Sequence, residues 1–308
     1  MRFALQVRCQ QQQGLIPRSL RCCQHRASSS SSLRARSLTS STSWAAALED
    51  YRRDGVAVVP SFAADATTDA MMASMAQLIE QWDPQSSRHS VFHVNSAEGA
   101  AADAGGDDAA LARDLYFFDT AYNNGFFLNP GAIDDATDDV RTDIPKAHLL
   151  NKVGHALHVH EPVFAEYSRS PQVAKLVGAL GYQDPVMPQS MYIFKQPLIG
   201  EQVSSHQDAT FLNTQPTLSC MGLLLFLEDA TLENGCLWAR KGSHLEPLRQ
   251  RWERNSAWFE AVAAGDSTAG LDAMQFVALD EETVSPAQAL IDSGQVRCAS
   301  SLGLAAGN

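Results

Sequence analysis

A histidine and an aspartate separated by one residue, His206 and Asp208, are the strongest candidates for chemistry in this sequence. On an extended segment, side chains two residues apart point to the same side. An imidazole and a carboxylate on one side are two of the three ligands in the 2-His-1-carboxylate set that holds non-haem Fe(II). The third ligand should be a histidine well downstream, yet the last histidine of the chain is His244.

Three other histidines, His155, His158 and His160, lie close together and are followed by Glu161 and Pro162. If this segment begins a helix, His155 and His158 share a face, which would suit a metal site. The other interpretation is that these side chains pack or form hydrogen bonds at the edge of a site. We favour the second interpretation, because the residues after Glu161 define no further ligand geometry.

The composition excludes several classes of protein. The chain has 308 residues, 45% of them hydrophobic, which suffices for one large domain or two small ones. Its formal net charge of −12 argues against nucleic-acid binding. An uninterrupted apolar run of about 18 residues is missing, so we expect no transmembrane helix. The six cysteines include no C-x-x-C pair, which argues against a disulfide framework or structural zinc and favours a reducing compartment.

Residues 1–43 differ from the rest of the chain. They contain seven arginines and many serines but no lysine, aspartate or glutamate. That composition is typical of an organellar transit peptide, and the alternative is a disordered tail. We therefore predict a mitochondrial protein, with a plastid or the cytoplasm as alternatives, and a single domain over residues 44–308.

Hydrophobic patterns in this domain predict helices mixed with short strands. We expect helices over residues 44–53, 65–82 and 164–182. We expect strands over residues 55–59, 115–118, 125–128, 191–195, 219–228 and 236–239. The short strands and tight turns between residues 185 and 245 are typical of an antiparallel sandwich or jelly roll. The run 219–228 is almost continuously apolar, which predicts a buried strand.

Four segments resemble the phytanoyl-CoA dioxygenase family of Fe(II)/2-oxoglutarate oxygenases, and within it the phytanoyl-CoA dioxygenase domain-containing proteins. They are residues 151–158 (NKVGHALH), 189–197 (QSMYIFKQP), 206–209 (HQDA) and 228–238 (EDATLENGCLW). The resemblance covers roughly residues 48–250, and the last segment is its most specific part.

The resemblance implies a mainly β fold with flanking helices, a double-stranded β-helix (jelly roll) with one Fe(II) at its open end. His206 and Asp208 would bind the iron, and Lys152 and Met191 would contact the co-substrate 2-oxoglutarate. It further implies O2-dependent hydroxylation of a small apolar or acyl-type substrate. Halogenating relatives carry a small residue where this chain has Asp208, so hydroxylation is favoured. His244 matches a family Gly-Ser-His motif that does not bind iron.

The sequence departs from the family pattern in two places. Leu224 stands where the subgroup has a tryptophan near the co-substrate. The distal histidine ligand and the arginine that follows it are missing, so we expect the jelly roll to be incomplete at its C-terminus. Three interpretations remain: a gene model that ends early, a non-catalytic ligand-binding protein of the same fold, or an oxygenase in which Asp292 or Cys298 replaces the missing ligand.

Overall fold

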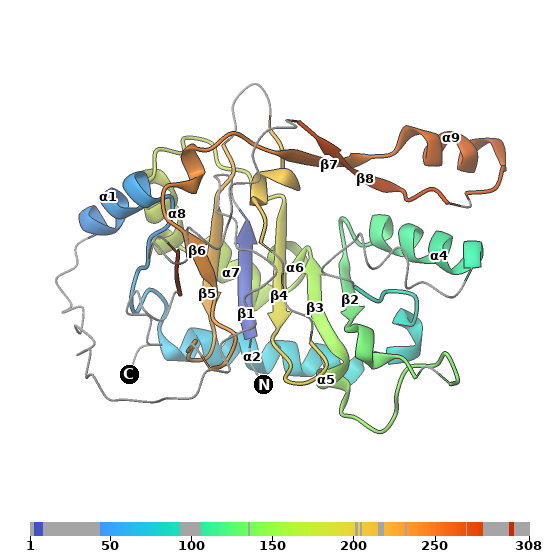
Figure 1. Cartoon of the computed structure of the whole chain (residues 1–308). Coiled ribbons are helices and arrows are strands. Elements are labelled where there is room, and N and C mark those ends of the chain that lie inside the picture. Colours follow the sequence, from blue (N-terminus) through green and yellow to red (C-terminus); the bar gives the residue numbers. More distant parts are fainter. Residues whose placement is uncertain are drawn as a thin grey trace, which may run out of the picture.

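A five-stranded antiparallel sheet lies at the centre of the computed structural model, with helices along one side of it (Figure 1). The structure describes residues 3–8, 44–92, 106–134, 136–200, 203, 205–214, 219–231, 233–268, 270–279 and 296–298. For residues 3–8, 106–109 and 296–298 it describes the backbone alone. The sheet has the order β2 (Asn124–Leu128), β3 (Leu150–His155), β4 (Gln189–Phe194), β1 (Phe3–Arg8) and β5 (Gly222–Phe226).

Two further pairs of strands complete the described sheets. β6 (Trp238–Arg240) pairs with β9 (Val296–Cys298), and β7 (Gln250–Arg254) pairs with β8 (Met274–Ala278). α9 (Ser256–Ala264) joins β7 to β8, and we call these three elements the hairpin arm. In Figure 1 the hairpin arm extends beyond the five-stranded sheet, above α4 (Gly106–Asp119).

The main core lies between the five-stranded sheet and its helices. From α2 (Asp65–Gln81) it takes Met71 and Met75, and from α7 (Pro162–Ser168) it takes Phe164. Tyr192 of β4 packs against these side chains and is fully buried. The helix expected over residues 65–82 forms as α2, and its methionines belong to the core. Burial of each such side chain contributes about 1.5–3 kcal/mol to folding.

The remaining helices are short. They are α1 (Trp44–Asp54), α5 (Lys146–Leu149), α6 (Leu157–His160) and α8 (Pro171–Ala179), with 3₁₀ turns η1 (Pro84–Ser87), η2 (Pro130–Ala132), η3 (Asp208–Thr210) and η4 (Ser243–Leu245). Among the helices that the structure describes, none is both long and apolar enough to cross a bilayer.

The fold class agrees with the prediction only in part. The described residues mix helices with antiparallel sheets, and the jelly roll is not confirmed. The strand predicted over residues 219–228 exists as β5, but it is half-buried along its length because it lies at one end of the sheet order. A turn at Asn234 and Gly235 follows it, but β5 and β6 belong to different sheets, so these two strands do not form a hairpin.

Three local predictions are wrong. Residues 115–118 end helix α4 instead of forming a strand, because an alanine-rich segment before them starts the helix. Residues 55–59 form no strand. The helix predicted over residues 164–182 is two helices, since Ser170 caps α8 by accepting a bond from the Val173 N–H and Pro171 begins it. One cysteine also departs from expectation, because Cys236 is disulfide-bonded.

The N-terminal strand β1 was not predicted, because it lies inside the segment expected to be a transit peptide or disordered tail. It pairs antiparallel with β4 on one side and with β5 on the other. Residues 9–43 lie outside the described residues, so the transit peptide and the mitochondrial location remain predictions. Removal of the whole segment would leave β4 and β5 without the strand they share.

Deleting residues 1–8 is expected to unpair β4 and β5, because β1 provides the ladder bonds between them. Hydrogen–deuterium exchange read by mass spectrometry should then show faster exchange in peptides covering residues 189–194 and 222–226. Peptides covering the β2–β3 pair serve as the internal control. Unchanged protection of β4 and β5 would show that β1 is not part of the sheet in solution.

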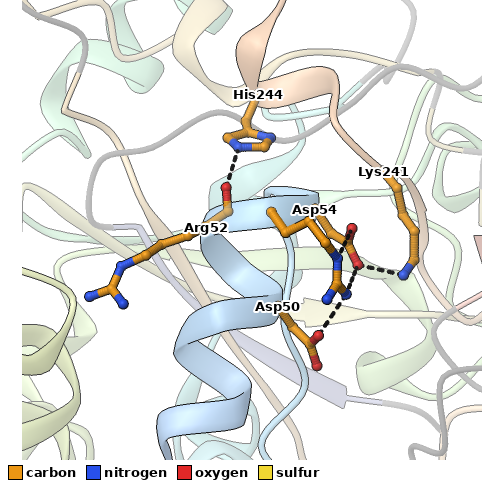
Figure 2. Close-up of polar contacts among 6 residues, drawn as sticks. Asp50, Arg52, Asp54, Lys241 and His244 are labelled. Atoms are coloured by element: carbon orange, nitrogen blue, oxygen red, sulfur yellow. Dashed lines mark hydrogen bonds and ion pairs between the residues drawn. The ribbon is translucent and has the colours of Figure 1, made fainter.

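α1 is joined to the segment after β6 by a group of polar contacts centred on Asp54 (Figure 2). The Asp54 side chain is 11% exposed, and its carboxylate accepts hydrogen bonds from Arg53 and, at 2.5 Å, from Lys241 Nζ. The Gly242 N–H donates to the Asp54 carbonyl at 2.8 Å, and His244 Nε2 lies 3.1 Å from the carbonyl of Arg52. His244 therefore has a structural contact with α1.

Gly55 allows this contact. Its φ of +76° is strained for residues with a side chain, and a Cβ there would lie 2.3 Å from His244 Nδ1. The chain can therefore leave α1 and still bring His244 close to the helix end only with glycine at this position.

The Asp54 contacts are expected to make stability depend on pH. The hydrogen bond from Arg53, followed by the contacts with Lys241, lowers the pKa of Asp54 from 3.8 to about 2 despite its burial. The stabilisation is therefore present above pH 4 and is lost as the pH falls toward 2. Asp54→Asn should lower the free energy of unfolding at pH 7 by about 1–2 kcal/mol, reduced by the solvent exposure of Arg53.

Urea unfolding from pH 7 downward measures this effect, and the difference between the chain and Asp54→Asn should shrink below pH 4. Asp50→Asn is the matched control, since the exposed Asp50 also accepts a bond from Arg53 but does not contact Lys241. A difference independent of pH would contradict the assigned pKa of Asp54.

Candidate functional site

His206 and Asp208 are brought together as the sequence predicts, although not on a strand. His206 precedes η3 in an irregular segment, and Asp208 is the first residue of η3. Gln207 between them has extended backbone angles, φ −100° and ψ 126°, which place its two neighbours on one side. His206 Nε2 lies 3.1 Å from Asp208 Oδ1.

The two side chains differ in their contact with solvent. The Asp208 side chain is 3% exposed, whereas the His206 side chain is 32% exposed. The backbone after Asp208 turns sharply, because the Asp208 carbonyl accepts bonds from the N–H groups of Phe211 and Leu212. Solvent therefore reaches the pair mainly at the imidazole of His206.

The donor set and its spacing suit a divalent metal ion. Ligand nitrogen and oxygen atoms bound about 2.1 Å from one ion at right angles lie about 3 Å apart, which matches the separation of His206 Nε2 and Asp208 Oδ1. The residues present therefore fit the two-ligand part of a metal site. Within the described residues, no group of three His, Cys, Asp or Glu side chains is placed to hold an ion.

Lys152 and Met191 lie on neighbouring strands and on one face of the sheet. Val153 and Tyr192, which are paired across β3 and β4, point into the main core. Because side chains alternate along a strand, Lys152 and Met191 point to the opposite face. The register aligns Lys152 with Ile193 and Gly154 with Met191, so the two predicted co-substrate residues lie diagonally across the two strands, two residue pairs apart along the ladder.

Leu224 shares this face, since its neighbours Leu223 and Leu225 pack against the main core. The face away from the helices thus carries three of the positions that the family resemblance assigns to the co-substrate. Gly154 is needed here, because a Cβ at its position would lie 2.8 Å from Met191 Cγ.

Lys152 is 8% exposed and lies among aromatic rings. Its Nζ is 3.2 Å from the centroid of Phe92 and 5.1 Å from that of Phe127. The faces of both rings are electron-rich and attract an ammonium group. Lys152 is therefore a buried lysine beside two aromatic rings, not a surface lysine.

A continuous run of aromatic contacts connects Lys152 to His206. Each member lies within 5.1–5.8 Å of the next. In order from Lys152, the rings are Phe127, His155, Phe117, Trp252 and Phe211. The last of them, Phe211, meets the His206 imidazole edge to face, and Phe276 also packs against it. The sheet, α4, η3 and the hairpin arm all contribute to this run.

The histidine cluster after β3 forms hydrogen bonds, as expected. His158 Nδ1 lies 2.7 Å from the Ser190 hydroxyl, and burial lowers the pKa of His158. His160 Nε2 lies 2.7 Å from the Tyr122 carbonyl. His155 is buried and packs against Phe117 and Phe127. Of the two substitute ligands considered, Asp292 and the side chain of Cys298 lie outside the described residues.

Gln207 and Phe211 lie within the candidate stretch of residues 206–211 but were given no role from the sequence, and Trp252 was not predicted as part of the site. Phe211 had a usable signal, because it follows Asp208 by three residues. Trp252 had none, since only the tertiary structure brings the hairpin arm to η3 through the Phe211–Trp252 contact.

Comparison with known proteins identifies the family. A family model described as Phytanoyl-CoA dioxygenase (PhyH) matches residues 51–283. The chain belongs to this family. The matched region contains His206, Asp208, Lys152 and Met191.

Curated relatives agree with this assignment. The chain is 38% identical over 207 residues to a phytanoyl-CoA dioxygenase domain-containing protein 1 of Danio rerio, which covers 67% of each chain. It is 39% identical over 207 residues to a phytanoyl-CoA dioxygenase of Arabidopsis thaliana, again 67% of each chain. A phytanoyl-CoA dioxygenase 1 of rice is 40% identical over 208 residues, 68% of this chain and 67% of the relative.

Proposed function

We propose that this member of the phytanoyl-CoA dioxygenase family is an Fe(II)- and 2-oxoglutarate-dependent oxygenase that hydroxylates a small apolar or acyl-type substrate with O2. The observation that carries the proposal is the His206–Asp208 pair, whose nitrogen and oxygen lie 3.1 Å apart within the matched family region. Members of this family generally use the same metal and co-substrate.

His206 and Asp208 would hold the metal. The low exposure of Asp208 keeps its carboxylate away from bulk water, which strengthens its attraction for a cation. Bound there, Fe(II) would couple the oxidative decarboxylation of 2-oxoglutarate to hydroxylation of the substrate by O2. The half-exposed side of His206 provides the direction from which small molecules reach the pair.

Lys152 would bind a carboxylate of 2-oxoglutarate. A cation on an apolar sheet face is a suitable partner for a dicarboxylate that leaves water, and the resulting bond is charge-assisted. Met191 on the same face would pack against the methylene groups of the co-substrate. Leu224 replaces the tryptophan of the subgroup with a smaller apolar side chain beside them.

The rings near His206 would contact the substrate. Phe276 is 40% exposed, and Phe211 and Trp252 are half-buried, unlike the fully buried Phe164 and Tyr192 of the core. Partly exposed aromatic side chains beside a polar pair are typical of surfaces that an apolar ligand covers. This arrangement supports an apolar substrate group near the metal ligands.

The second candidate is a protein of the same fold that binds 2-oxoglutarate or an apolar ligand without turnover. It is favoured by the two-donor set, because the described residues supply His206 and Asp208 but no third ligand. The two candidates share ligand binding and differ in chemistry.

Isothermal titration of 2-oxoglutarate with Mn(II), a stable substitute for Fe(II), is expected to show binding that depends on the metal. Lys152→Met should weaken 2-oxoglutarate binding about 10-fold or more, since it removes a charge-assisted hydrogen bond of about 1.5–3 kcal/mol. Binding of Mn(II) alone should be unchanged in this variant, because Lys152 is not a proposed metal ligand.

Lys175→Met is the matched control, because Lys175 also lies over an aromatic ring, with its Nζ 5.2 Å from the Trp44 centroid. It should leave 2-oxoglutarate binding unaffected. Heat of 2-oxoglutarate binding that is equal with and without Mn(II), or equal in Lys152→Met, would count against the proposed site.

A further inference from the structure

Gln207, the residue between the two proposed metal ligands, is held by the main chain of a distant segment. Its side chain is buried, with 2% of the residue exposed. The Gln207 Nε2 donates to the Pro247 carbonyl at 3.2 Å, and Gln207 Oε1 accepts from the Arg249 N–H at 3.2 Å. The side-chain amide thus donates one hydrogen bond to the backbone of residues 247–249 and accepts another from it, as a backbone peptide group does in a β-sheet.

This arrangement follows from the extended backbone at Gln207. Because alternate side chains point to opposite sides, the Gln207 amide points away from the side shared by His206 and Asp208. It can therefore be bonded to the protein without contacting a metal ion. Two bonds to one side-chain amide also fix its rotation, which a single bond does not.

The segment that holds Gln207 is itself anchored. The Glu246 carboxylate forms ion pairs with Arg240 and, at 3.0 Å, with Arg249. Farther back, the Gly242 N–H bonds to the Asp54 carbonyl at the end of α1. On its other side the segment leads into β7, whose Trp252 contacts Phe211 just after the metal pair. The segment that bonds to Gln207, on the side opposite His206 and Asp208, is therefore held by ion pairs, a backbone hydrogen bond and an aromatic contact.

We propose that Gln207 is a positioning residue that sets the separation of His206 and Asp208 for metal binding. The inference rests on the proposed function, because it concerns the same metal site. Without the two amide bonds, the backbone at residue 207 could rotate, and the imidazole and carboxylate would no longer be held in one arrangement. Residues that orient metal ligands in this way change metal affinity by about 10–100-fold when they are replaced.

The test measures Mn(II) affinity of the full chain by electron paramagnetic resonance of the free ion, at a temperature at which circular dichroism shows each variant to be folded. Gln207→Met keeps the length of the side chain and removes both hydrogen bonds, and it should weaken Mn(II) binding about 10-fold. Gln207→Asn withdraws the amide by one methylene and should weaken binding as well, which keeps the test valid if the methionine variant does not fold.

Gln196→Met is the matched control, because Gln196 is also buried and donates to a backbone carbonyl, that of Ala147, at 2.7 Å. It should lower the melting temperature as Gln207→Met does but leave Mn(II) affinity unchanged. Equal Mn(II) affinity in the chain and in both Gln207 variants would overturn the positioning role, as would an equal loss in Gln196→Met. If the unmodified chain binds no more Mn(II) than His206→Ala, the proposed function itself fails, and the positioning role with it.

Discussion

The extended backbone at Gln207 is the constraint on which the candidate site depends. It places an imidazole and a carboxylate on one side of the chain, 3.1 Å apart, and points the intervening amide toward the opposite side. Because the turn of η3 begins at Asp208, the extended backbone ends directly after Gln207. A residue pair two apart in sequence becomes a possible chelate because the surrounding structure holds this short segment in place.

The sheet divides the rest of the molecule into two environments. The helices α2, α6 and α7 pack on one face, and the main core lies between them and the sheet. The other face carries Lys152 and Met191, and aromatic rings connect it to His206. The first face therefore carries the main core, and the second carries the residues that the family resemblance assigns to the co-substrate.

The site was predictable from the sequence where its geometry is local. His206 and Asp208 were identified because two residues on an extended segment always share a side. The common face of Lys152 and Met191 depends on the register between β3 and β4, and the residues alone do not determine that register. The two hydrogen bonds of the Gln207 side chain could not be predicted from the sequence either, because their partners lie about 40 positions away along the chain.

The wrong predictions of helices and strands have the same cause, because a local sequence pattern does not determine long-range contacts. Residues 115–118 are a short apolar run, which periodicity cannot assign to a strand or to the end of a helix. The tight turns expected between residues 185 and 245 include the one at Asn234 and Gly235, but a turn does not decide which strands pair, and β5 pairs with β1 instead of β6. Strand β1 has the alternating apolar positions Phe3, Leu5 and Val7 that are typical of a strand, but the composition of residues 1–43 as a whole favoured a transit peptide.

Release of CO2 from 2-oxoglutarate by the full chain with added Fe(II) and O2 is the most direct test of the account. If His206 and Asp208 form a working metal site, CO2 and succinate should form in equal amounts, at a rate clearly above that of the His206→Ala variant. A rate for the unmodified chain no greater than that of His206→Ala would contradict the oxygenase function and leave ligand binding without turnover as the explanation of this site.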